Sequence, residues 1–391
     1  MEAYLDNSAT TRVCPEAAAI VQQLMLEDFG NPSSMHRRGV ESEKYVRRAR
    51  ETLASLLKVR EKDIYFTSGG TESDNWAVFG TAEAARRRGR HLIISSLEHP
   101  AVSAPVQHLE EQGYEVTRLS ADREGRIDLD ELEAAVRPDT ILVSVMYVNN
   151  ETGSVQPVAE AAKAVHRKNP DTWFHTDAVQ GFGKYRILPK REGIDMMSVS
   201  GHKFHGPKGT GFLYIDERVK LKPLIYGGGQ QNGMRSGTDN VPGIAGLAAA
   251  AGAVYRDREE TERHMTALKK KLTEGLLSMD NVRINGMSDP ASWYDTGLHA
   301  PHIVNASFIG VRSEVLLHTL EDRGICVSAG SACSSHKRAG SPTLTAIGCT
   351  KEEMESSLRF SFAGTTTEQE IDWTLQTLLD VVPMLRRFTR K

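Results

Sequence analysis

Two residues of opposite charge, Asp177 and Lys203, each follow an apolar run that is typical of a buried β-strand. The runs are WFHTD at 173–177 and MMSVS at 196–200. Ligands of open α/β sheets bind at the carboxyl ends of the strands, so both side chains are candidates for one site. An acid and a lysine there could form no more than a salt bridge. Pyridoxal phosphate needs both groups, because a lysine forms a Schiff base with it and an acid keeps its pyridine nitrogen protonated.

Other polar side chains that suit this cofactor follow the same set of predicted strands. His99 follows LIISSLE and offers an imidazole that can stack on the cofactor ring. Thr71, Ser200 and His202 can donate to a phosphate, and the glycine pair before Thr71 lets the backbone approach it at a helix start. Each feature alone is common, since a lone histidine is more often structural and glycine turns join many strands to helices. The whole set predicts a pyridoxal phosphate site.

The elements that must position these residues alternate along the first two thirds of the chain. Apolar β-prone runs occur at 64–68, 92–96, 140–148, 173–177 and 196–200. Stretches with apolar residues at helical spacing lie between several of them, at 41–58, 75–89, 128–137 and 156–168. This alternation predicts an α/β fold with a mainly parallel central sheet flanked by helices.

A long helical stretch from residue 244 leads into a second set of predicted strands and helices. The strands are HIVNASF and ICVSAG. A chain of 391 residues is long enough for a large domain and a smaller partner. We expect a large cofactor-binding domain at 13–255 and a smaller α+β domain formed by 1–12 and 256–391.

Composition excludes several classes of partner. The formal net charge of −3 provides no overall field that would attract nucleic acid or an anionic membrane. No apolar stretch approaches the roughly 20 residues that span a bilayer, and MEAYLDNSATT has no signal-peptide pattern. We therefore expect a cytoplasmic protein with no membrane contact and no direct nucleic-acid partner. Four cysteines without a CxxC pair predict free thiols and no metal site.

Ten motifs, in order along nearly the whole chain, resemble those of the cysteine desulfurases, which are fold-type I enzymes of the class V aminotransferase-like group. The motifs are YLDNSATT, GNPSSMHRRG, FTSGGTESDN, EHPAV, NNETG, HTDAVQ, SGHKFHGPKG, GGGQQNGMRSGT, SAGSACSS and LRFSF. The resemblance implies an enzyme that converts L-cysteine to L-alanine and keeps the sulfur as a persulfide on a cysteine of its own.

The resemblance also implies a role for each matching residue. Lys203 would hold pyridoxal phosphate, Asp177 would pair with its pyridine nitrogen, and His99 would stack on its ring and serve as an acid or base. The remaining cofactor contacts would come from Gly70, Thr71, Asn150, Gln180, Ser200, His202 and, across a homodimer interface, Thr238. The substrate L-cysteine would contact Asn31, Asn150 and Arg359, whose planar guanidinium suits a carboxylate.

Cys333 is the expected sulfur carrier, because it lies in a loop of small and polar residues, SAGSACSSH at 328–336. Cys326, between Ile325 and Val327, is instead typical of a buried strand position. The loop resembles the family branch with a long, mobile cysteine loop. That branch implies direct delivery of sulfur to an iron–sulfur scaffold or a tRNA-thiolation protein, and the sequence does not choose between them.

The sequence departs from the family pattern in two places. A glutamate-arginine pair often follows GGGQ, where this chain has Gln231 and Asn232. A Gly-Arg pair often follows the strand of the substrate arginine, where it has Ala363 and Gly364. These changes leave the predicted cofactor set intact and concern the entrance of the site and the docking of partners.

Three other functions use some of these features. A selenocysteine lyase, or another class V lyase or aminotransferase, would keep the same cofactor set without needing the cysteine loop. A dinucleotide-binding oxidoreductase would need GxGxxG after its first strand, and GGTES does not match. A sulfur carrier or metal-binding module without enzymatic activity would not need Lys203 and Asp177.

Overall fold

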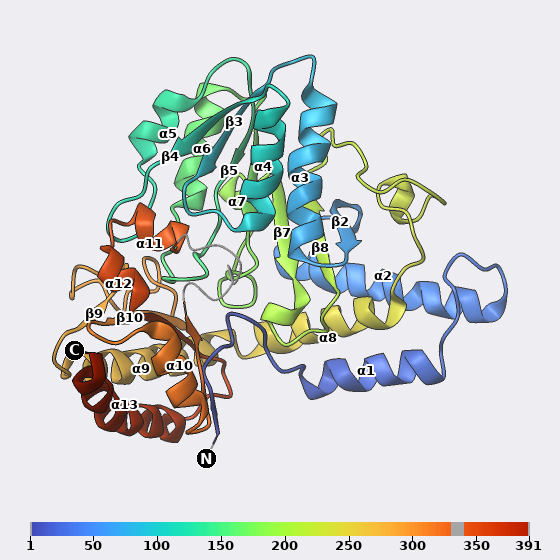
Figure 1. Ribbon diagram of the computed structural model, residues 1–391. Coiled ribbons are helices and arrows are strands. Elements are labelled where there is room, and N and C mark those ends of the chain that lie inside the picture. Colours follow the sequence, from blue (N-terminus) through green and yellow to red (C-terminus); the bar gives the residue numbers. More distant parts are fainter. Residues whose placement is uncertain (1, 330–339, 390–391) are drawn as a thin grey trace.

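The computed structural model describes residues 2–329 and 340–389, so Cys333 lies outside the described residues (Figure 1). Its larger sheet has seven strands in the order β2-β8-β7-β6-β5-β3-β4. All are mutually parallel except β8, which is antiparallel to both neighbours. The strands are β2 (Ile64–Thr67), β3 (His91–Ser95), β4 (Glu115–Leu119), β5 (Thr140–Ser144), β6 (Trp173–Asp177), β7 (Met196–Ser200) and β8 (Gly211–Ile215). The predicted mainly parallel α/β sheet is therefore confirmed.

Helices cover both faces of this sheet and extend beyond one side of it (Figure 1). Those of the sheet region are α3 (Gly70–Ala85), α4 (Pro100–Glu111), α5 (Leu129–Ala135), α6 (Val158–Lys168) and α7 (Pro189–Glu192). Three further helices pack together beside it, α1 (Pro15–Leu26), α2 (Arg37–Leu57) and α8 (Val241–Arg256). The hairpin of α1 and α2 forms an arm that projects from the body.

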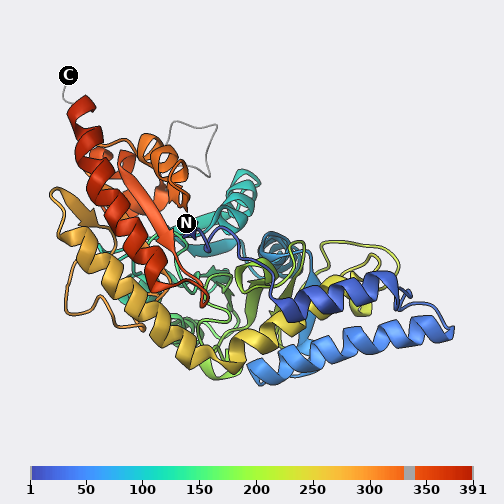
Figure 2. The same cartoon turned by 90° about the horizontal axis from the view of Figure 1, so that it is seen from below.

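A second, antiparallel sheet of four strands has the order β12-β13-β10-β9, and a two-stranded sheet pairs β1 with β11. The strands are β9 (Val282–Ile284), β10 (Ile303–Phe308), β12 (Ser328–Ala329), β13 (Ser357–Ser361), β1 (Ala3–Tyr4) and β11 (Ile325–Cys326). Figure 2 shows two long helices, α9 (Arg258–Leu277) and α13 (Glu368–Thr389), packed against this part. The shorter helices are α10 (Ser313–Glu321), α11 (Pro342–Ala346) and α12 (Lys351–Glu355).

The two sheets have separate hydrophobic cores. The core of the smaller sheet includes Ala3 and Leu5 from the N-terminal segment together with side chains of α9, α10 and α13. This arrangement supports a smaller domain built from both ends of the chain. The division at residues 255 and 256 stays a prediction; it falls at the end of α8, one residue short of its last helical residue.

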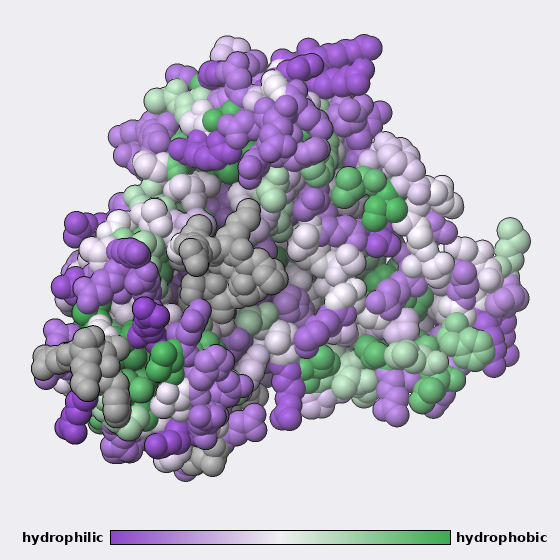
Figure 3. Space-filling view, viewed as in Figure 1, coloured by the Kyte–Doolittle hydropathy of each residue, from purple (hydrophilic) through white to green (hydrophobic). Residues whose placement is uncertain are grey.

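The surface of the projecting arm carries several exposed apolar side chains. Met25, Leu26 and Phe29 are 64%, 68% and 64% exposed, at the end of α1 and just beyond it. Figure 3 shows hydrophobic residues gathered along this arm, at the lower right of the view. Within the described part of the chain, no helix is both long enough and apolar enough to cross a membrane.

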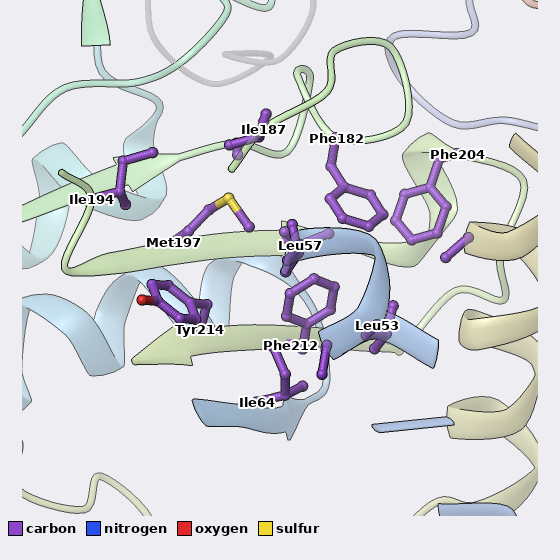
Figure 4. Close-up of a cluster of buried hydrophobic side chains, with 14 of the residues drawn as sticks. Leu53, Leu57, Ile64, Phe182, Ile187, Ile194, Met197, Phe204, Phe212 and Tyr214 are labelled. Atoms are coloured by element: carbon purple, nitrogen blue, oxygen red, sulfur yellow. The ribbon is translucent and has the colours of Figure 1, made fainter. Parts of the chain in front are cut away.

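Apart from the edge strand β4, the strands of the larger sheet are buried on both faces, as their runs of apolar residues predict. Successive side chains of a strand point to opposite faces of the sheet and so pack into two different hydrophobic cores. Ile93 of β3 and Met197 of β7 lie in the first core, whereas their neighbours Leu92 and Met196 lie in the second. Figure 4 shows part of the first core, where Met197 of β7 lies among side chains of several elements. Such close packing fixes the strand ends, and with them the side chains that follow each strand.

Candidate active site

Asp177 and Lys203 lie after two adjacent parallel strands, as the sequence predicts. Asp177 is the last residue of β6, opposite Ser198 of β7. After β7 the chain turns through the 3-10 helix η2 (Gly201–Lys203), and Lys203 is the last residue of that turn. The Lys203 Nζ donates to the carbonyl oxygens of Ser8 and Ala9, at 2.5 Å and 2.9 Å. The cofactor candidates of the sheet therefore meet the N-terminal segment of the chain.

The Asp177 carboxylate is only 5% exposed, and its Oδ1 accepts a hydrogen bond of 2.8 Å from the Val179 amide. Burial raises its pKa, whereas the nearby charges of His99 and Lys203 lower it. Positive charge at these two neighbours favours the ionised form of a carboxylate that burial alone would neutralise, and Lys203 supplies that charge when His99 is neutral.

His99 is the N-cap of α4, and its Nδ1 accepts a 3.1 Å hydrogen bond from the Ala101 amide. The bond fixes the neutral tautomer with its proton on Nε2. His99 is an exposed residue, but desolvation by the surrounding protein lowers its pKa. The Asp177 charge raises this pKa, and the Lys203 charge lowers it. His99, Asp177 and Lys203 thus form one electrostatic group.

A hollow of about 330 Å³ lies at the N-terminus of α3, next to this group. It is lined by Thr10, Ser68, Gly69, Gly70, Thr71, Glu72, Ser200, His202, Lys208 and Gly209. A larger residue at position 70 would force Val179 to shift, because a Cβ there would lie 2.7 Å from Cγ2 of Val179. Free helix amides, hydroxyl groups and Lys208 make the hollow suitable for a phosphate. The Glu72 charge is already paired with Arg235, at 2.8 Å.

Gln180 joins the same group through the N-terminal segment. Its Nε2 donates to the Ser8 carbonyl, at 3.0 Å, and this oxygen also accepts from Lys203. Thr11 and Thr10 tie the segment to His202, through a 2.9 Å bond to its carbonyl and a 3.2 Å contact with its Nδ1. Ser8, Ala9 and Thr10 were not among the predicted site residues, although the motif YLDNSATT marks the segment.

Arg359 lies in β13 of the smaller sheet and is 8% exposed. Its Nη1 donates to the Asn150 carbonyl at 2.8 Å, and its Nη2 pairs with Asp6 at 3.0 Å. Its Nε is buried without a hydrogen-bond partner among the described residues. The Nε–H of the guanidinium is therefore an unused donor, and the backbone of Asn150 lies beside it.

Two predicted residues lie elsewhere in the single chain. Asn31 is exposed in the loop between α1 and α2, where its Oδ1 accepts a 2.9 Å bond from the Ser33 amide. Thr238 is exposed in the segment before α8 and does not line the hollow at α3. Neither is brought to Lys203 by its own chain. Cys333 lies outside the described residues, so the structure does not locate it.

The residues that do meet fit pyridoxal phosphate. The glycine-lined hollow suits its phosphate, the buried Asp177 suits its pyridine nitrogen, and Lys203 supplies an amine next to both. His99 adds an imidazole beside the acid. Within the described residues, no group of three or more His, Cys, Asp or Glu side chains could hold a metal ion.

Comparisons with known proteins agree with this chemistry. The aminotransferase class-V family model matches residues 3–373. A cysteine desulfurase IscS of Methanosarcina thermophila is 43% identical over 386 residues, which cover 99% of this chain and 93% of that protein. A cysteine desulfurase of Trichormus azollae is 42% identical over 384 residues, which cover 98% of this chain and 93% of that protein.

Solved structures share the architecture over nearly the whole chain. A NifS-like protein aligns with a TM-score of 0.91 at 36% identity, covering 98% of this chain and 100% of its own. SspA in complex with cysteine aligns with a TM-score of 0.80 at 31% identity, covering 93% of this chain and 100% of its own. The similarity therefore includes both sheets and the site between them.

Proposed function

The chain belongs to the class V aminotransferase family and is a pyridoxal-phosphate-dependent cysteine desulfurase, and from this premise we propose which of its residues carry the reaction. Lys203 holds the cofactor, Asp177 pairs with its pyridine nitrogen, and His99 covers its ring. Gly70, Thr71, Ser200 and His202 hold its phosphate, and Gln180 donates to its phenolic oxygen. The observation that carries this proposal is the group of Asp177, His99 and Lys203 beside the hollow at α3.

Pyridoxal phosphate supplies an electron sink for the carbon atoms of a bound amino acid. Arg359 binds the substrate carboxylate through its unused Nε, and Asn150 lies beside it. Asn31 belongs to the same substrate set. The Lys203 amine, once released, takes the α-proton of the substrate and returns a proton when L-alanine forms. L-cysteine as the substrate is supported by the similar structure of SspA in complex with cysteine.

Cys333 receives the sulfur. Its thiolate attacks the sulfur atom of L-cysteine, a new S–S bond forms, and the C–S bond breaks with its electron pair moving to the carbon side. The products are a persulfide on Cys333 and, after protonation at the β-carbon, L-alanine. In this proposal His99 exchanges the thiol proton, and its lowered pKa, which keeps the ring neutral near pH 7, supports that role.

The active unit is a homodimer in this proposal, with Thr238 of one subunit at the phosphate of the other. The exposed apolar side chains of the α1–α2 arm support an interface between copies, because such a patch is otherwise costly in water. The physiological acceptor is an iron–sulfur scaffold or a tRNA-thiolation protein in the cytoplasm.

The deciding experiment is Cys333→Ser. We expect this variant to bind pyridoxal phosphate and to change its visible spectrum with L-cysteine, but to release no sulfide. Peptide mass spectrometry of the unmodified enzyme after brief exposure to L-cysteine should find the extra sulfur on Cys333. Desolvation raises the pKa of Cys14, Cys326 and Cys349, so these thiols should stay unmodified.

Cys326→Ser is the matched control and should retain normal sulfide production. If Cys333→Ser forms sulfide and alanine at the normal rate, the persulfide role is wrong. The chain would then act as a lyase, and selenocysteine would become the substrate to test against L-cysteine.

A further inference from the structure

A second cavity, of about 480 Å³, lies where the N-terminal segment, the α8–α9 junction and the turn after β13 meet. Figure 2 shows these three parts of the chain on the side seen from below. Most of its wall is apolar, with contributions from Val13, Val254, Met265 and Phe362. A volume of this size holds a small organic molecule. Of the residues proposed to bind the cofactor, only Lys203 lines it.

The floor of this cavity contains a histidine without hydrogen bonds. His302 is 1% exposed, and its Nδ1 and Nε2 both lack a partner among the described residues. Burial keeps the ring neutral by lowering its pKa. An imidazole that is buried without a partner costs free energy, so it marks a place for a ligand that supplies one.

Lys184 brings a cation to the same cavity. Its Nζ donates to the carbonyl oxygen of Lys203 at 2.5 Å, and its charge acts on His302. Burial, followed by the charge of Lys203, lowers the pKa of Lys184 to about 7. Asp257 and Arg12 also line the cavity, but no described carboxylate forms an ion pair with Lys184. The carbonyl of Lys184 accepts from Arg258 at 3.3 Å. An anion is the partner that this ammonium lacks.

The mouth of the cavity is open because residue 364 is a glycine. Gly364 is exposed and lines the opening together with Thr365. A Cβ at residue 364 would lie 2.9 Å from Cγ2 of Thr261, on the opposite wall. A larger side chain at residue 364 would therefore extend toward this wall and narrow the opening.

We propose that this cavity binds a small organic carboxylate, with its carboxylate group on Lys184 and His302 and its apolar part against Val13, Val254 and Met265. The ammonium of Lys184 and the neutral imidazole of His302 suit a carboxylate group, and the mostly apolar wall suits a hydrocarbon tail better than it suits a phosphate. Because Lys184 also donates to the backbone of Lys203, the ligand lies one hydrogen bond away from the cofactor lysine.

The test uses 4-methylpentanoate and its uncharged counterpart, 4-methylpentanamide, added to the enzyme loaded with pyridoxal phosphate. Binding is measured by calorimetry and by the methyl resonance of Met265, which lines the cavity. We expect 4-methylpentanoate to shift this resonance and to bind at least tenfold more tightly than the amide. Lys184→Gln should remove that preference, because the ammonium is replaced by a neutral amide.

Gly364→Arg closes the mouth and should abolish binding of both probes, while Gly252→Ala is the matched control. A Cβ added at Gly252, on α8, would have no neighbour within 4 Å, so this change should leave binding unaltered. Equal affinity for the two probes, or unchanged binding in Lys184→Gln, would overturn the proposal. None of these measurements depends on Cys333 or on turnover, so they stand apart from the proposed reaction.

The pH dependence of binding gives an independent check. The titratable groups that interact with Lys184 include Lys203, His202, His205 and His302, and Arg12, Cys14 and Asp257 line the same cavity. Lys184 must itself be charged to hold a carboxylate. We expect the affinity for 4-methylpentanoate to fall as the pH rises from 7 to 9, with uptake of a proton on binding. Lys184→Gln should show neither effect, and an unchanged affinity across this range in the normal enzyme would contradict the assignment.

Discussion

Lys203 is the residue on which every step of the proposed reaction depends, because it both holds the cofactor and carries the α-proton. We predict that Lys203→Ala lowers turnover by at least about a thousandfold and removes the visible, borohydride-sensitive absorbance of the lysine-bound cofactor. Lys208→Ala is the control, since Lys208 lines the same hollow but is exposed. If the absorbance survives in Lys203→Ala and is lost in Lys208→Ala, the attachment site is Lys208.

Glu98, the residue before His99, gives a pH-dependent prediction. Its Oε1 accepts from the Ser95 hydroxyl at 2.5 Å and the Met146 amide at 2.7 Å, and its Oε2 is buried without a partner among the described residues. Burial raises its pKa from 4.5 to about 8, and the Asp177 charge adds to this. Between pH 4.5 and about pH 8, Glu98 is protonated in the folded protein and ionised in the unfolded chain. The free energy of unfolding therefore falls as the pH rises through this range, by about 1.4 kcal/mol per pH unit.

Glu98→Gln cannot titrate, so its stability relative to the normal protein should increase from pH 5.5 to pH 8 and then level off. Urea denaturation midpoints of the cofactor-free proteins measure this difference at each pH, and other titrating groups cancel in the comparison. Glu111→Gln is the control for replacing a carboxylate by an amide at an exposed position of α4. A constant difference in Glu98→Gln across this pH range would contradict the raised pKa of Glu98.

The sequence predicted the site residues that follow strands. It did not predict those that reach the site from a segment far away in the sequence. Asp177, His99 and Lys203 follow strands that the sequence marks, and the shared edge of a parallel sheet brings them together. The Ser8 carbonyl bonded to Lys203 lies 195 residues away in sequence, and a backbone oxygen leaves no trace in residue type. Lys184 was missed for a similar reason, because nothing around it in the sequence indicates that its surroundings lower its pKa to about 7.

At the scale of elements, the packing of α3 against the end of β6 forms the hollow that we propose for the phosphate. We predict that Gly70→Ala weakens the binding of pyridoxal phosphate by about tenfold or more, because the added methyl group would lie 2.7 Å from Val179, next to Asp177. Equilibrium dialysis of the cofactor-free protein measures the effect. Gly252→Ala, an uncrowded helix position, should leave the affinity unchanged, and equal affinities in both variants would contradict the packing argument.

Two strands of the larger sheet were not predicted, and each has a physical reason. β4 is an edge strand with the sequence EVTRL, so its exposed polar residues interrupt the apolar run that marks a central strand. β8 follows the glycine-rich turn after Lys203 and runs antiparallel, which the alternation of strands and helices does not predict. The predicted run at 140–148 was too long, because β5 ends at Ser144 and the next residues lead into the turn that holds Asn150.

At the scale of the whole molecule, a single chain leaves the proposed site incomplete. Thr238 and Asn31 are both exposed and away from Lys203. The apolar side chains of the arm stay largely exposed, although the Arg38 guanidinium lies over the Phe29 ring. A second copy would explain all three observations, since the arm and the segment before α8 could then reach the partner's site. Each site would combine Lys203 of one subunit with Thr238 of the other.

Mixed dimers test this exchange. In a heterodimer of Lys203→Ala and Thr238→Asp subunits, shared sites would leave one site with both changes and one site with neither. We predict that each parent homodimer has lost at least about tenfold of its activity: Lys203→Ala lacks the cofactor lysine, and the carboxylate of Thr238→Asp repels the phosphate. Purified heterodimers should recover about half of the normal activity per dimer. Differently tagged subunits allow the heterodimer to be isolated before the assay. Activity no higher than that of the parents would place Thr238 in the site of its own subunit, since every site would then carry one of the two changes.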